Sequence, residues 1–133
     1  MPAFHPTKDQ FRALRDDPHE GPIIMVNLLK FHEMAQYPDD APEAAENLTG
    51  EAAYARYEAG LGDFIAACGG EMVYTGKAVR FYIGEGEWDR VLIVRYPSRA
   101  AFVAMVTNPD YQIPHRHREA GLKHQDLIET REA

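Results

Sequence analysis

The densest group of titratable side chains lies near the end of the chain, in the run HRHR at 115–118. On a continuous helix Tyr111, His115 and Arg118 share one face, because their spacings are four and three residues. A neighbouring arginine favours the neutral form of a histidine, and a neutral imidazole can act as a general base. Since a nearby proline leaves the facing of the helix open, we predict His115 or His117 as proton acceptor and Arg118 as anion-binding group. The alternative is a solvated, positively charged helix end that complements the helix dipole.

Three further polar side chains stand in apolar surroundings. Asn27 lies in the apolar run MVNLLKF, Tyr57 lies on the apolar stripe of a helix, and Arg95 lies in the strand-like run RVLIVRY. Buried polar groups need hydrogen-bond partners, and a ligand can supply them. We predict that Asn27, Tyr57, Arg95 and Tyr111 bind a small-molecule ligand. The alternatives are a structural hydrogen bond for Asn27, core packing for the tyrosines and an intersubunit salt bridge for Arg95.

A metal site receives little support from the sequence. His115, His117 and His124 give the pattern H-x-H-x₆-H, but helical positions two residues apart diverge by about 200°. Cys68 is the only cysteine, which excludes cysteine-based zinc sites and an internal disulfide. No phosphate-cradling glycine loop or nucleophile elbow is present. We therefore expect no metal and no other cofactor.

The composition excludes several classes of protein. A chain of 133 residues that is 45% hydrophobic is typical of one globular domain spanning the whole sequence. The net charge of −7 disfavours nucleic-acid binding, because a phosphate backbone repels an acidic protein. No apolar run approaches the roughly 20 residues that span a membrane, and no signal peptide is evident at the N-terminus. We therefore expect a cytoplasmic protein that binds neither nucleic acid nor membranes.

Hydrophobic periodicity predicts the elements that must position these side chains. An N-terminal helical extension within residues 1–20 and a long surface loop over 32–50 flank the first strand. A helix is predicted over 51–68 because its apolar residues form one stripe at helical spacing. The other expected elements are strands over 22–31, 71–83 (bent near Gly76), 90–96 and 123–130, a helix over 99–107, and a further helix ending at Gly121 with a kink or second start near Pro114.

This order of elements predicts a fold. A helix followed by β-α-β-β-α-β is the ferredoxin-like arrangement, an α+β fold with a four-stranded antiparallel sheet. Helices would cover one face of the sheet, while the strands carry apolar residues on both faces. We therefore predict a homodimer in which the two uncovered sheet faces meet.

Several motifs resemble the domain of unknown function 1330 family. They include MVNLLKF at 25–31, EAAYARY at 51–57, YPSRAAF at 96–102 and NPDYQ at 108–112, in the order typical of that family. The resemblance covers nearly the whole chain from residue 22 onward. It implies a ferredoxin-like fold within the dimeric α+β-barrel superfamily, which includes cofactor-free monooxygenases, muconolactone isomerases and small stress-responsive proteins. It assigns no catalytic residue.

Two functions remain open from the sequence. The first is an isomerase-like or monooxygenase-like enzyme that acts without cofactor on a small organic acid, lactone or aromatic metabolite. The second is a non-catalytic ligand-binding or stress-associated homodimer, whose pocket is filled by side chains. Polar groups set in an apolar pocket wall favour the first, and the lack of a recognisable nucleophile or metal cluster favours the second.

Overall fold

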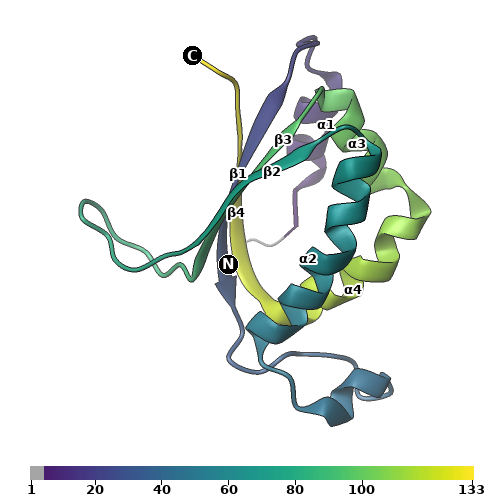
Figure 1. The fold of residues 1–133 in the computed structure, drawn as a ribbon, viewed down its shortest axis with the longest axis vertical. Helices are drawn as coiled ribbons and strands as arrows, with labels where there is room; N and C mark the ends of the chain where they lie inside the picture. The colour runs from purple at the N-terminus through teal and green to yellow at the C-terminus, as the bar shows by residue number, and fades with distance from the viewer. Residues whose placement is uncertain (1–4) are drawn as a thin grey trace.

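The protein is described here by a computed structural model that covers residues 5–133. Its helices and strands are α1 (Lys8–Asp16), β1 (Ile23–Phe31), α2 (Gly50–Ala67), β2 (Glu71–Lys77), β3 (Arg90–Tyr96), α3 (Arg99–Thr107), α4 (Gln112–Gly121) and β4 (Leu122–Thr130). The four strands form one antiparallel sheet in the order β2-β3-β1-β4. Helices α2, α3 and α4 lie on one face of it (Figure 1). The predicted α+β, ferredoxin-like fold with an N-terminal helix is therefore confirmed.

The core lies between the sheet and these helices. Side chains alternate along β1, with every second residue buried towards the helices and the others half-buried on the opposite face. Most buried residues of β1, α2 and β3 are large and apolar. The core consists of Ile23, Met25, Leu29, Phe31, Tyr54, Tyr57, Leu61, Ile65, Leu92, Val94, Tyr96, Met105, Tyr111 and Leu122.

The opposite face of the sheet carries no helix (Figure 1). On this face strand β1 carries Ile24, Val26 and Leu28, all of which are half-buried within the single chain. We call this surface the open face. Within residues 5–133, no helix is both long and apolar enough to cross a membrane.

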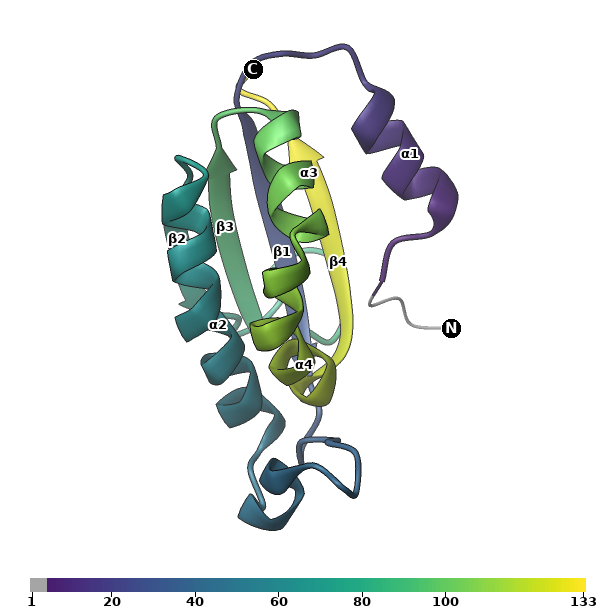
Figure 2. The same ribbon diagram turned by 90° about the vertical axis from the view of Figure 1, so that its right-hand side faces the viewer.

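Helix α1 stands apart from the other helices, beside the β4 edge of the sheet (Figure 2). A capping box opens this helix: the Thr7 side chain accepts from the Gln10 backbone, and the Gln10 side chain accepts from the Thr7 backbone. Phe11 and Leu14 are its only half-buried helical residues. Because α1 half-buries only these two side chains, few contacts hold the helix against the rest of the protein.

Helix α4 runs without interruption through Pro114. This proline is the third residue of the helix, where the backbone N–H groups have no partner inside the helix, so its missing N–H costs nothing there. The predicted kink or second start at Pro114 is therefore wrong, and the short 3₁₀ helix Pro109–Tyr111 leads into α4 at Gln112 instead. The far end of α4 touches α2 closely, because a Cβ on Gly121 would lie 2.4 Å from the Gly50 carbonyl oxygen. The two helices are thereby fixed relative to each other.

The second strand is shorter than the sequence suggests. Strand β2 ends at Lys77, and the predicted continuation over 78–83 is wrong because β3 offers it no partner beyond Arg90. Its register shift lies between Met72 and Tyr74 rather than at Gly76. Residues 78–89, which we call the arm, project from the sheet as a long hairpin-like excursion (Figure 1).

Candidate functional site

A cavity of about 810 Å³ lies between the sheet, the helices packed on it and α1. Its floor comes from β1, β3 and β4, and α1 closes one side through Phe11 and Leu14. Of the predicted site residues, Asn27, Tyr57, Tyr111, His115 and Arg118 all line it. Helical spacing along α4 and strand alternation along β1 bring these groups together from distant parts of the chain.

One wall carries a directed chain of hydrogen bonds. Arg118 Nη2 donates to Gln125 Oε1 at 2.6 Å, and Gln125 Nε2 donates to Asn27 Oδ1 at 2.7 Å. Asn27 Nδ2 then donates to the Leu92 carbonyl oxygen at 3.0 Å. The chain ends on a backbone acceptor, so each amide is fixed in one orientation. We call Arg118, Gln125 and Asn27 the relay; it holds the guanidinium on the cavity wall.

The cavity lining also includes two tyrosines whose hydroxyl groups bond to each other, Tyr57 and Tyr111. Their side chains are buried, at 5% and 6% exposure. Burial raises the pKa of both hydroxyls, so both stay neutral at physiological pH. A neutral hydroxyl pair keeps one donor hydrogen beyond the shared bond, and this hydrogen can bind an oxygen of a ligand.

His115 lies between Tyr111 and Arg118 in the sequence and lines the same cavity. Its ring packs on Tyr111 with centroids 5.4 Å apart, and its Nε2 lies 3.1 Å from Glu119 Oε1. Burial, together with the charge of Arg118, lowers the pKa of His115, which favours the neutral ring. Its Nδ1 is buried and has no hydrogen-bond partner within residues 5–133. The arrangement fits a ring that carries its proton on Nε2, towards the carboxylate.

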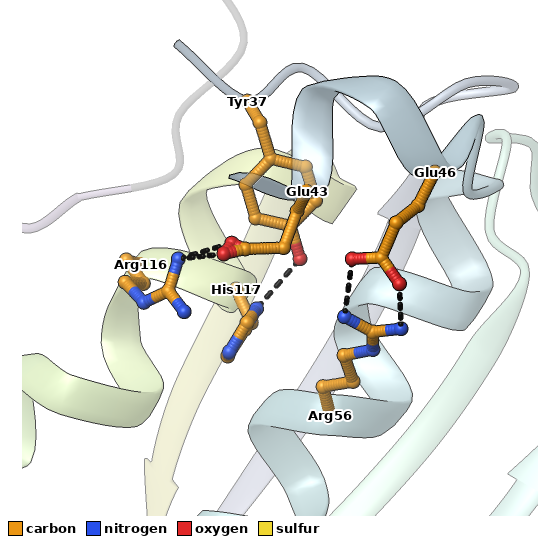
Figure 3. Close-up of polar contacts among 6 residues, drawn as sticks. All are labelled: Tyr37, Glu43, Glu46, Arg56, Arg116 and His117. Atoms are coloured by element: carbon orange, nitrogen blue, oxygen red, sulfur yellow. Dashed lines mark hydrogen bonds and ion pairs between the residues drawn. The ribbon is translucent and has the colours of Figure 1, made fainter. Parts of the chain in front are cut away.

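His117 points away from the cavity, towards the loop at 32–50. Its Nδ1 lies 2.6 Å from the Tyr37 hydroxyl oxygen (Figure 3). Beside it, Arg116 donates twice to the buried Glu43 carboxylate at 2.6 Å. Arg116 holds the pKa of Glu43 below its usual value, so this pair stays charged at neutral pH. His117 and Arg116 therefore fasten the loop to α4.

The same loop is fastened to α2 by a second ion pair. The two terminal guanidinium nitrogens of Arg56 donate to the Glu46 carboxylate, at 2.9 and 3.0 Å (Figure 3). Glu46, like the Glu43 that bonds Arg116, belongs to the short 3₁₀ helix Pro42–Glu46. The loop is thus attached beside the cavity and contributes none of its lining.

Arg95 also lies away from the cavity. On β3 the residues Leu92, Val94 and Tyr96 face the helices, so Arg95 faces the open side of the sheet with Ile93. The predicted ligand contact of Arg95 is therefore not part of this cavity.

Three polar residues of the cavity region escaped the sequence analysis. Gln125 lies on the side of β4 that faces the cavity, and its alternating position in the strand was the only feature of the sequence that could have indicated this. Glu119 follows His115 by four residues, which is the helical spacing of a side-chain pair. His5 reaches the cavity because α1 docks beside β4, and no local pattern predicts such docking. His5, His115 and Glu119 are also the one group of potential metal ligands found within residues 5–133.

Comparisons with known proteins agree with this fold. Residues 43–129 match the model of the domain of unknown function DUF1330. The chain is similar to a protein of unknown function from Rhodopseudomonas palustris, with 36% identity and a TM-score of 0.89 over 100% of this chain and 98% of that one. A comparison with curated proteins found no match.

More distant structures share the fold alone. A dabb family protein with a ferredoxin-like fold from Mesorhizobium loti has 12% identity and a TM-score of 0.53, over 86% of this chain and 99% of that one. An Arabidopsis thaliana protein has 14% identity and a TM-score of 0.51, over 84% and 95%. The chemistry of the site must therefore be argued from its own residues.

Proposed function

Because the chain belongs to the DUF1330 family, whose description names no activity, we propose its function from the cavity: it binds a small organic acid as substrate of an enzyme of the dimeric α+β-barrel type. The observation that carries this proposal is the guanidinium of Arg118, fixed by the relay on the wall of a largely apolar cavity. Among side chains, arginine is the one best suited to hold a carboxylate through two parallel hydrogen bonds.

The electrostatics of the wall support an anionic ligand. Arg118 bonds Gln125 through a neutral amide oxygen, so this contact orients the guanidinium without cancelling its charge. The lowered pKa of His115 reflects that charge in part, next to the effect of burial. A carboxylate entering the cavity would meet a positive field in surroundings of low polarity, where such an interaction is strong.

The rest of the cavity supports a ligand with an apolar body. Its volume of about 810 Å³ is in the range of small-molecule sites, roughly 300–1,000 Å³. Most of the wall away from the relay is aliphatic or aromatic. These wall residues include Met25, Leu61, Leu92, Val94, Tyr96, Phe102, Met105 and Val106.

His115 is the proton acceptor in this proposal. It lines the cavity beside Arg118, whereas His117 bonds Tyr37 outside it. With the proton of the neutral ring on Nε2, Nδ1 carries the lone pair that accepts a proton from the ligand. Glu119 would then stabilise the imidazolium, as a carboxylate does for the histidine of a catalytic triad. Tyr57 and Tyr111, which also line the cavity, would orient the ligand through their hydroxyl groups.

The proposal includes a homodimer formed through the open face. The half-buried Ile24, Val26 and Leu28 present an apolar surface there. Tyr82 and Ile83 of the arm are 96% and 84% exposed, which is unusual for large apolar side chains and favours contact with a second copy. Native mass spectrometry should give twice the chain mass of 15.0 kDa, and V26D should give a monomer. A wild-type monomer would contradict this assembly.

The binding proposal is tested with a panel of small aromatic and aliphatic carboxylic acids, each paired with its uncharged amide. Calorimetry should identify acids that bind, while the amides do not. R118M should weaken acid binding about tenfold or more, because hydrogen bonds to charged groups contribute about 1.5–3 kcal/mol. R12M, on the exposed surface of α1, is the matched control and should change the affinity by less than twofold.

Two results would contradict this proposal. Equal binding of acids and amides would remove the role of the charge, and equal binding by R118M and wild type would remove Arg118. Binding of an acid without any turnover would leave the ligand site intact and favour the non-catalytic ligand-binding function.

A further inference from the structure

Three side chains with metal-binding atoms meet at one edge of the cavity: His5, His115 and Glu119. One nitrogen or oxygen atom from each lies within 4.8 Å of the others. Glu119 Oε1 is 3.1 Å from His115 Nε2 and 3.8 Å from His5 Nε2. The two imidazole rings have centroids 6.1 Å apart. This cluster stands beside the Arg118 wall.

The fold explains why these three residues meet. His115 and Glu119 are separated by four residues on α4, so they occupy neighbouring positions on one face of the helix. His5 precedes α1, which lies beside β4 (Figure 2), and its Nε2 comes within 3.8 Å of Glu119 Oε1 on α4. His5 and His115 both line the cavity, so an ion held between them would face its interior.

We propose that His5, His115 and Glu119 bind one divalent transition-metal ion, of the Zn²⁺ or Fe²⁺ class, at the edge of the cavity. Two imidazoles and one carboxylate form a donor set typical of catalytic zinc and of non-haem iron. Three protein ligands leave further coordination positions open to water or to a ligand in the cavity. The same residues would hold the ion in both cases.

The distances suit such an ion after a small movement. Metal–ligand bonds of about 2.0–2.2 Å place neighbouring donor atoms about 3–3.5 Å apart. The His115–Glu119 separation of 3.1 Å already meets this requirement. His5 is about half exposed and its donor atom lies within 4.8 Å of the other two, so this surface side chain would have to move closer to complete the site.

The electrostatics contain one favourable and one opposing contribution. The Glu119 carboxylate attracts the ion, and burial keeps His115 in the neutral form that coordinates metals. The nearby charge of Arg118 opposes the ion. A carboxylate ligand placed between the ion and Arg118 would relieve this repulsion, so metal and organic acid should strengthen each other's binding.

This last consequence rests on the proposed function, whereas the metal site itself does not. A metal ion on Nε2 of His115 replaces the proton that this atom directs to Glu119. In the metal-loaded protein the ion would lower the pKa of a bound water, to about 7 on zinc, and the hydroxide formed when that water releases its proton to solvent would be the proton acceptor in place of the imidazole.

The test is a titration of the full chain with ZnCl₂ in the absence of any organic acid. The protein is prepared without a tag, stripped with chelator and desalted, because an N-terminal tag would lie close to His5. Calorimetry should show one ion bound per chain. H5Q, H115Q and E119Q should each weaken binding at least tenfold, as loss of one of three ligands requires.

H117Q and H124Q are matched controls that remove a histidine outside the cluster, and both should bind within twofold of wild type. Co²⁺ gives a second readout, since visible absorption bands should appear in wild type and be lost in E119Q. Equal binding by wild type and H5Q, or no one-to-one binding below 100 µM, would overturn the site. Circular dichroism verifies that each variant is folded, and the exposed His5 keeps H5Q informative if H115Q unfolds.

Discussion

Helix α4 presents the same two residue types to two different surroundings. On the cavity side, His115 bonds the Glu119 carboxylate and Arg118 bonds the neutral amide of Gln125. On the loop side, the chemistry is reversed: His117 bonds the neutral Tyr37, and Arg116 bonds a buried carboxylate. Four successive residues thus divide into one pair that faces a cavity and one pair that fastens a loop.

The comparison shows that the partner, rather than the residue type, decides what an arginine can do. Arg116 already has its anion in Glu43, whose side chain is only 6% exposed. The guanidinium of Arg118 is oriented by a neutral group and lies on a cavity wall. An anionic ligand in the cavity is therefore expected to meet Arg118, which lines it, and not Arg116, which does not. The following variants test that division.

The largest expected effect comes from breaking the relay. Q125L leaves Asn27 Oδ1 without its donor in the protein interior, which should destabilise the fold by about 2 kcal/mol. Urea denaturation measures this change. The double variant N27L/Q125L should lose less than the sum of the two single variants, because neither amide is left buried without the other as its partner. Additive losses would contradict a coupled relay.

The next effect concerns the loop side of α4. R116M removes the ion pair with Glu43 and should accelerate amide hydrogen exchange across Pro42–Glu46. It should leave the affinity for organic acids within twofold of wild type. R118M should do the opposite, with normal exchange in this segment and weakened acid binding. A loss of acid binding in R116M would show that the two pairs are not separate.

Low pH should break the ion pair between Arg116 and Glu43 that attaches the loop to α4. The pKa of Glu43 is lowered in the folded protein by its bonds to Arg116, so its contribution to stability is full above the ordinary glutamate pKa of 4.5. It is lost as the pH falls through the lowered folded value. Exchange across Pro42–Glu46 should therefore rise below about pH 4.5 in wild type. E43Q should lack this part of the pH dependence, and an unchanged profile would exclude Glu43 as its source.

The smallest effect is expected for the Tyr37–His117 bond. Y37F removes one partly exposed hydrogen bond and should cost about 0.5–1 kcal/mol in the free energy of unfolding, measured with urea. Acid binding should be unchanged, since neither residue lines the cavity. A large loss of affinity for organic acids in Y37F would show that His117 contributes to the binding site.

The sequence predicted most of the elements because their signals are local. The apolar stripe over 51–68 predicted a helix there, and in the structure Thr7, Thr49 and Ser98 cap α1, α2 and α3. The apolar segment 78–83 resembled a strand, but a strand also needs a partner, and local patterning does not report where pairing ends. The prediction therefore failed where the arm leaves the sheet.

The residues of the site also divide into those that local sequence patterns predict and those that depend on tertiary contacts. The spacing of Tyr111, His115 and Arg118 predicted that they share a face, and the structure places all three on the cavity wall. Gln125 and His5 depend on tertiary contacts between distant segments, which periodicity cannot show. The facing of His117 depended on whether α4 continues through Pro114, and Pro114 falls within the first turn, where a helix tolerates it.

The most direct test of this account is a crystal structure of the protein with the tightest-binding acid from the panel. We predict that the carboxylate of the ligand lies in the cavity, with its oxygens about 2.7–3.2 Å from the Arg118 guanidinium nitrogens. The apolar body of the ligand should contact the aliphatic wall. A carboxylate bound at Arg116 or elsewhere on the surface, with the cavity empty of ligand, would contradict it.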